Sequence, residues 1–403
     1  MHESAKKIER NHGIDLLRIV AMFMIVVLHV VGHGGILDAT LGLTLKGEVA
    51  WFLEIACYCS VNCYALISGF VAINSKRKWR TFISLWFQVV FYCVVINAMD
   101  IILSGGFDAI GLIGVLKVGI HSFLPSLTNR YWYFTAYTGV FLCMPILNWI
   151  VNHIPRSLLK ASFIGSIFIF YCGDRLLSSG SALALENGCS FLWLALLYVM
   201  GAYMAKYDSL KRLSFKKSIL GFVLCVVITF LTRIGIEIVI CLIKGYVVKN
   251  SYEALMLSYT TPTIVLAAVF LLNAFRQMQF SEMGAKVIGL FAPLSFGVYL
   301  LHTHPVVFWK LHYVFSDLAR YHVVLMVLCI IGSAVGIYIL CTVVELLRKM
   351  LFSLLRINKA AICIEKNAEK LFQKVSPVLG INPADFSEEN MSLDDLLHKD
   401  VNV

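Results

Sequence analysis

The chain has 403 residues, of which 59% are hydrophobic and only 14% are charged, and its mean hydropathy is +0.81. Soluble globular domains carry about 25% charged residues, so this composition excludes a soluble enzyme and indicates a protein that crosses a membrane many times. The net charge of +10 is explained by the lysines and arginines that membrane proteins collect in cytoplasmic loops, and no nucleic-acid partner is expected.

Ten apolar segments are expected to form transmembrane helices, so the predicted fold is an all-α, polytopic helical bundle surrounded by membrane lipid. Loops rich in lysine and arginine follow the second, fourth, sixth, eighth and tenth segments, whereas the alternate loops contain fewer of these residues. The positive-inside rule therefore places both termini in the cytoplasm. The segments lie near residues 14–34, 49–73, 81–103, 131–152, 161–177, 188–206, 218–243, 254–275, 286–308 and 322–347.

The first segment carries a polar stripe. Arg18 and His29 are eleven residues apart, which is about 16 Å along a helix and within roughly 20° of the same direction. Asp15 precedes Arg18 by three residues and His33 follows His29 by four, so all four side chains share one face. Because an arginine facing lipid is costly, the stripe is expected to face the protein interior or a wet cavity. The alternative is an arginine at the membrane surface and a histidine that only packs between helices.

Two stretches are not expected to be simple spans. Residues 108–125 are short and rich in glycine, and they are predicted to form an interfacial or re-entrant helix on the outer side. Residues 351–403 are more polar and form a short cytoplasmic tail, with a helix expected near 360–375. The membrane domain is therefore predicted to occupy residues 1–350.

Three further motifs lie at or near the second, fourth and ninth apolar segments. The first is Ser68-Gly69-Phe70 at the end of the second segment, followed in the sequence by Arg77 and Arg80. The second is Arg130 before the fourth segment with Trp132-Tyr133-Phe134 at its start. The third runs from Pro293 to His302 within the ninth segment. Together with the spacing of Arg18 and His29, these motifs resemble the acyltransferase-3 family over about residues 10–350.

The resemblance implies an integral membrane O-acyltransferase of polysaccharides, lipopolysaccharide or related cell-envelope glycans, in the cytoplasmic membrane of a bacterium. It implies an acyl-CoA donor, often acetyl-CoA, taken from the cytoplasm. The acceptor is a hydroxyl of a glycan or another envelope molecule, often on the opposite side of the membrane.

On the donor side, Arg18, Arg77 and Arg80 are expected to bind the phosphates of coenzyme A, because guanidinium groups offer forked donors and a permanent charge. Ser68 is expected in the same site. His29 is predicted to be the general base or to receive the acyl group itself, and Asp15 to orient Arg18. The alternative for Arg77 and Arg80 is an ordinary basic cytoplasmic loop.

On the acceptor side, Arg130, Trp132, Tyr133 and His302 are the candidate residues. The aromatic rings can stack on a sugar, and Arg130 can bind hydroxyls or a carboxylate of the acceptor. The alternatives are an aromatic belt with an arginine at lipid headgroups, and a histidine that caps a helix.

A transporter or flippase of an envelope precursor is the competing hypothesis, since a polar stripe can also line a permeation path. Two related halves with matching broken helices would favour it, and the sequence shows no such repeat. No metal is expected, because the four-residue spacing of His29 and His33 lacks an accompanying acidic residue at metalloprotease spacing.

Overall fold

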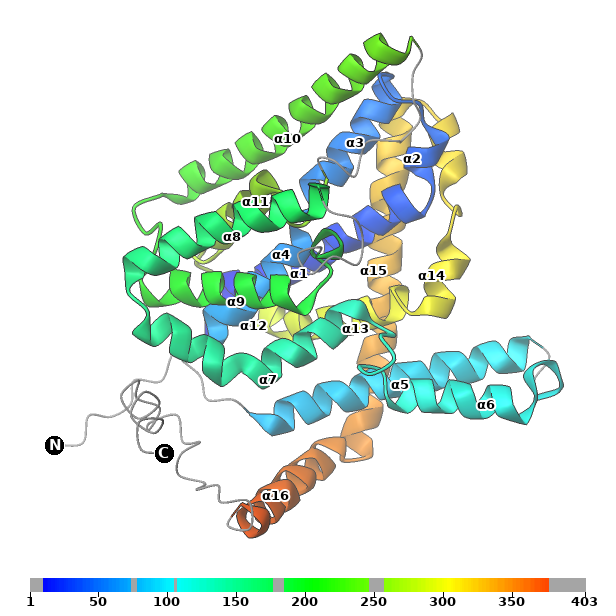
Figure 1. Cartoon of the computed structure of the whole chain (residues 1–403). Coiled ribbons are helices and arrows are strands. Elements are labelled where there is room, and N and C mark those ends of the chain that lie inside the picture. The colour runs from blue at the N-terminus through cyan, green and yellow to red at the C-terminus, as the bar shows by residue number, and fades with distance from the viewer. Residues whose placement is uncertain (1–9, 74–77, 105–106, 177–184, 246–256, 377–403) are drawn as a thin grey trace.

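The computed structural model describes residues 10–73, 78–104, 107–176, 185–245 and 257–376, and within these ranges it contains helices and no strands (Figure 1). The predicted all-α fold is therefore confirmed. The helices are α1 (His12–Leu28), η1 (His29–His33), α2 (Ile36–Ala39), α3 (Leu45–Cys57), α4 (Ser60–Ala72), α5 (Trp79–Leu103), α6 (Phe107–Phe123), α7 (Trp132–His153), α8 (Arg156–Leu176), η2 (Glu186–Gly188), α9 (Phe191–Lys206), α10 (Phe215–Lys244), α11 (Pro262–Phe275), α12 (Glu282–Phe291), η4 (Ala292–Leu294), α13 (Ser295–His302), α14 (Pro305–Leu311), η5 (Ser316–Arg320), α15 (Val323–Leu354) and α16 (Ile357–Val375).

The protein is a polytopic helical membrane protein. In the described parts of the chain, eight continuous or nearly continuous helical stretches are long and apolar enough to cross a membrane, and they coincide with eight of the predicted segments. The sixth and eighth predicted segments fold as shorter helices, α9 with 16 residues and α11 with 14 residues, or about 24 and 21 Å at ~1.5 Å per residue. Both pack against α4 inside the bundle, so neighbouring helices cover much of their surface.

Two of the predicted spans are interrupted. The second consists of α3 and α4, which are separated at Tyr58 and Cys59. The ninth consists of α12, the 3-10 turn η4 and α13, and Pro293 lies in that turn. Proline has no amide hydrogen to continue an α-helical ladder, which accounts for the change of helix type at this point.

The stretch predicted to be interfacial or re-entrant forms α6, which runs back beside α5 so that the two helices project from the bundle as a hairpin (Figure 1). The Asn97 side-chain amide donates a hydrogen bond of 2.8 Å to the Ser122 hydroxyl across this pair. The helix expected near 360–375 is α16. It packs against α5, where the backbone N–H of Arg80 donates to the Glu365 carboxylate at 2.9 Å.

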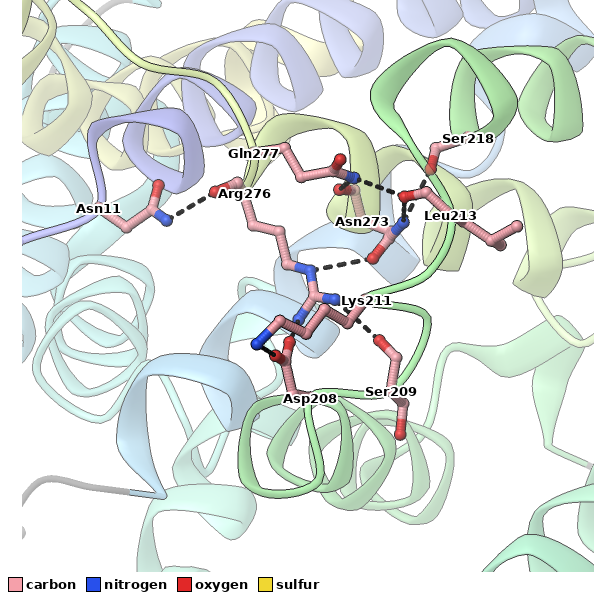
Figure 2. Close-up of polar contacts among 9 residues, drawn as sticks. All are labelled: Asn11, Asp208, Ser209, Lys211, Leu213, Ser218, Asn273, Arg276 and Gln277. Carbon is pink, nitrogen blue, oxygen red and sulfur yellow. Dashed lines mark hydrogen bonds and ion pairs between the residues drawn. The ribbon is translucent and has the colours of Figure 1, made fainter.

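A hydrogen-bond network fixes the start of α1 against the ends of neighbouring helices (Figure 2). The Asn11 amide donates to the carbonyl of Arg276 at 2.9 Å, and the Arg276 guanidinium contacts Asp208 at 2.9 Å and Asn273 at 2.9 Å. Asn273 in turn donates to the Ser218 hydroxyl at 2.7 Å. The network joins α1 to α10, to α11 and to the turn after α9, and so it positions the end of α1 that carries Arg18.

Helices α4 and α9 form the most extensive helix pair, and two glycines permit their close approach. A Cβ atom at Gly69 would overlap the carbonyl oxygen of Tyr198, and one at Gly201 would overlap that of Leu66. Small residues allow helix backbones to meet in this way inside membranes. The Ser68-Gly69-Phe70 motif therefore has a packing role, because Gly69 brings the backbone of α4 against α9.

We expect Gly69→Ala and Gly201→Ala to destabilise the protein by about 1–3 kcal/mol, because backbone atoms cannot move aside as a flexible side chain can. The measurement is the midpoint of thermal unfolding of each detergent-purified variant. Gly332→Ala is the matched control, since Gly332 is exposed in α15 and an added Cβ meets nothing within 4 Å. Equal midpoints for all three variants would contradict the close helix contact.

Candidate active site

Two cavities lie along α1, each named here after a residue of the stripe. The Arg18 cavity, of about 540 Å³, lies beside the first turns of α1 and is lined also by the end of α4, the start of α5 and part of α7. The His29 cavity, of about 560 Å³, lies beside the last turns of α1 and the π-helical turn η1. Arg18 and His29 therefore face two adjacent cavities along one helix, in agreement with the predicted stripe.

The Arg18 cavity is lined by the cations Arg10, Arg18 and Lys78. Behind them lies Asp15, only 2% exposed, with one carboxylate oxygen 2.5 Å from Arg10 and the other 2.5 Å from Arg18. Arg18 itself remains 30% exposed. One buried carboxylate thus orients two guanidiniums while the cavity keeps an excess of positive charge, which favours an anionic ligand such as a phosphate.

Beside the His29 cavity, the α-helical ladder of α1 changes to a π turn over residues 29–33. Turns of this type are rare in proteins, and those that occur are often found at functional sites. His29 and His33, at the two ends of this turn, both line the cavity. The ring of His33 is stacked on Phe308 with centroids 3.5 Å apart, and its Nε2 is 2.7 Å from the Phe308 carbonyl oxygen.

His29 has less fixed surroundings than His33. Its ring centroid is 5.1 Å from that of His302 and 5.1 Å from that of Phe308. Its Nδ1 is buried and has no hydrogen-bond partner among the described residues. The imidazole therefore lines the cavity without a hydrogen bond at Nδ1 that would fix its tautomer.

The two cavities share an aromatic wall formed by Tyr64, Tyr133 and Phe296, which line both of them. The rings of Tyr64 and Tyr133 lie edge to face with centroids 6.3 Å apart. The Tyr64 hydroxyl donates to the backbone carbonyl of Arg18 at 2.6 Å, which ties the wall to α1. The wall thus separates the cationic cavity from the cavity that contains His29.

The structure brings most of the predicted site residues to these cavities. Arg18 and Ser68 line the first, His29, Arg130 and Trp132 line the second, and Tyr133 belongs to both.

The remaining candidates lie elsewhere. His302 is buried behind His29 and is not among the residues that line the His29 cavity, because it lies on the inner face of α13 with Nδ1 2.6 Å from the Val298 carbonyl. Arg80 is exposed at the start of α5. Arg77 lies outside the described residues.

Several lining residues were not identified from the sequence. Lys78 lines the Arg18 cavity, and its position between Arg77 and Arg80 in a basic loop is the signal that was available from the sequence. Tyr64, Phe296 and His312 come from three distant helical regions, and only the tertiary packing brings them together.

Comparison with protein families decides the assignment. The acyltransferase-3 family model, described as an acyltransferase domain, matches residues 11–343, which include both cavities except Arg10. The chain belongs to the acyltransferase-3 family. It is therefore a multi-pass membrane acyltransferase. Comparisons with curated proteins and with solved structures gave no match.

The described residues contain no group of three or more histidine, cysteine or acidic side chains arranged to hold a metal ion.

We expect Asp15→Asn to lower the midpoint of thermal unfolding, because a neutral amide leaves the Arg10 and Arg18 guanidiniums without their counter-charge. Hydrogen bonds to charged groups contribute about 1.5–3 kcal/mol when buried, and the partial exposure of both arginines places the loss toward the lower end. Asp317→Asn is the control, since Asp317 and Arg320 form an exposed pair of the same chemistry. An equal, small change in both variants would contradict a structural role for Asp15.

Proposed function

We propose that the protein is an O-acyltransferase of a bacterial cytoplasmic membrane. It takes an acyl group, in the simplest case acetyl, from cytoplasmic acyl-CoA and transfers it to a hydroxyl of a cell-envelope glycan on the other side. The observation that carries this proposal is the pair of cavities along α1, one cationic and one lined by His29 and aromatic rings, which meet at a single wall. Family membership supports the acyl-transfer chemistry.

The donor occupies the Arg18 cavity in this proposal. Its phosphates contact Arg10, Arg18 and Lys78, which line the cavity near the loop that is rich in basic residues. The distribution of lysine and arginine places that loop in the cytoplasm, where acyl-CoA is available. Arg77 and Arg80 belong to the same loop and are proposed to contact the phosphates as well.

The pantetheine arm then extends along α1 and brings the thioester to the aromatic wall. Arg18 and His29 are about 16 Å apart along the helix axis, and the wall lies between their cavities. For the thioester to meet an acceptor on the other side, the rings of Tyr64, Tyr133 and Phe296 have to move apart. The wall otherwise keeps water in the His29 cavity from reaching the thioester.

His29 acts as the general base in the transfer step. Its imidazole takes the proton of the acceptor hydroxyl while the hydroxyl oxygen attacks the carbonyl carbon of the thioester. The carbon–sulfur bond then breaks, the ester remains on the acceptor, and the proton passes from the imidazolium to the thiolate of coenzyme A. In the alternative route, the imidazole attacks the thioester first and passes the acyl group on.

A transporter with the same two cavities is the second candidate, because separate cavities divided by a closed wall also suit alternating access. A transporter moves its cargo unchanged, whereas the acyltransferase releases one free coenzyme A for each ester formed.

We expect His29→Ala to lower the rate of acyl transfer by about 10²–10⁴-fold, the usual contribution of a general base. The measurement is release of free coenzyme A thiol by purified protein supplied with acetyl-CoA and an envelope glycan extract. His121→Ala, on α6 and outside both cavities, should match the wild type. Normal transfer by folded His29→Ala protein would remove His29 from the reaction, and no thiol release by the wild type would favour the transporter.

We expect Lys78→Gln to weaken coenzyme A binding by about ten- to a hundred-fold, as for loss of a charge-assisted contact to phosphate. Arg80→Gln should have a smaller effect, because Lys78 and Thr81 line the cavity while Arg80 is not among its lining residues. Calorimetric titration of coenzyme A into detergent-purified protein measures both. Lys160→Gln on the exposed part of α8 is the control, and equal affinities for all variants would remove this cavity from the donor site.

A further inference from the structure

Among the residues that the structure describes, those that line the His29 cavity include one permanent cation, Arg130, and no acidic residue. The Nε atom of Arg130 is buried and has no hydrogen-bond partner among the described residues. None of the ion pairs formed within the described ranges includes Arg130. A buried cationic donor without a partner is costly, so a cavity that retains one is suited to a ligand that supplies the counter-charge.

Other arginines that the structure places away from solvent differ from Arg130 in this respect, because each contacts a carboxylate. Arg233 lies between Glu48 and Glu237, at 2.5 Å from each, although it is only 8% exposed. The same holds for Arg18 with Asp15, Arg276 with Asp208 and Arg348 with Glu345. The bundle therefore neutralises its shielded guanidiniums, and Arg130 is an exception located in the cavity assigned to the acceptor.

The rest of the cavity suits a sugar. The ring of Trp132 is stacked on that of Tyr259 with centroids 6.2 Å apart, and Tyr131, Tyr299 and Trp309 contribute further aromatic surface. Flat apolar rings with a polar edge can contact a sugar face while hydroxyl and N–H groups reach its substituents. His29 borders the same space, so a sugar held there lies next to the proposed base.

We infer that the acceptor carries an anionic group, a carboxylate or a phosphate, and that Arg130 binds this group in the His29 cavity. The inference rests on the proposed function and specifies its acceptor. A guanidinium matches the two oxygens of either group with parallel N–H donors. The donor phosphates do not need Arg130, because three cations line the Arg18 cavity across the wall. An acidic sugar and a phosphate linking the sugar to a lipid or to the next residue present the same chemistry to Arg130.

The test compares envelope glycans from cells that lack the protein with those from cells that express the wild type. Mass spectrometry and two-dimensional NMR locate the ester that depends on the protein. We expect the acylated sugar, or the residue directly attached to it, to carry a carboxylate or a phosphate, and the spectra distinguish these two sources. An ester on a neutral sugar with neutral neighbours would overturn the inference and leave the proposed function intact. Glycans without any dependent ester would contradict the proposed function itself.

Variants of Arg130 provide a second test of the inference. Arg130→Gln should reduce acylation in these cells by about ten- to a hundred-fold, and Arg130→Lys should restore only part of it, since an ammonium keeps the charge and loses the fork. Lys310→Gln is the matched control, because Lys310 pairs with Asp100 outside the His29 cavity. Unfolding midpoints of the purified variants identify any that fail to fold. Full acylation by folded Arg130→Gln protein would overturn the inference.

Discussion

The ion pairs of the Asp15 carboxylate hold the cationic side chains at the start of α1, beside the Arg18 cavity. The carboxylate is buried at the start of α1 and contacts Arg10 and Arg18 with separate oxygens. An arginine in an apolar bundle needs such a partner, because an isolated charge in a medium of low polarity is costly. The contact with Asp15 offsets the charge of Arg18 while Arg18 remains partly exposed at the edge of the Arg18 cavity. All of the residues between Arg18 and His29 are apolar.

The position of α1 in the bundle determines which cavities Arg18 and His29 line. The helix is fixed at its start by Asn11 and the Arg276 network (Figure 2). It is fixed at its middle by the hydrogen bond from the Tyr64 hydroxyl to the Arg18 carbonyl. It therefore presents a cation to one cavity and an imidazole to the next. The aromatic wall separates the cationic Arg18 cavity, which is the proposed donor site, from the His29 cavity, which is the proposed acceptor site. In the proposed function, this separation allows the enzyme to take its donor from one side of the membrane and its acceptor from the other.

The part of the site that lies within one helix was predictable from the sequence. The eleven-residue spacing of Arg18 and His29 predicted a common face, and the structure places both on cavity walls along α1. The eight long spans were also predictable, because apolar length is a local property. The lengths of α9 and α11 were less evident, since helices covered by neighbours do not need to match the thickness of a bilayer by themselves.

The part that depends on packing between distant segments could not be predicted. The wall combines Tyr64 from α4, Tyr133 from α7 and Phe296 from α13, and no local pattern relates them. His302 was a candidate for the acceptor site, and the structure places it next to His29 but not among the residues that line the His29 cavity. The role of Arg77 stays a prediction, because this residue lies outside the described ranges.

The central claim is that donor and acceptor occupy different cavities that meet at the aromatic wall. The most direct measurement is a cryo-electron microscopy structure of the protein in lipid nanodiscs with a thioether analogue of acetyl-CoA, which cannot transfer its acyl group. The account predicts density for the phosphates beside Arg18 and Lys78, and for the sulfur atom at Tyr64, Tyr133 and Phe296. Phosphate density in the His29 cavity, or outside both cavities, would contradict it.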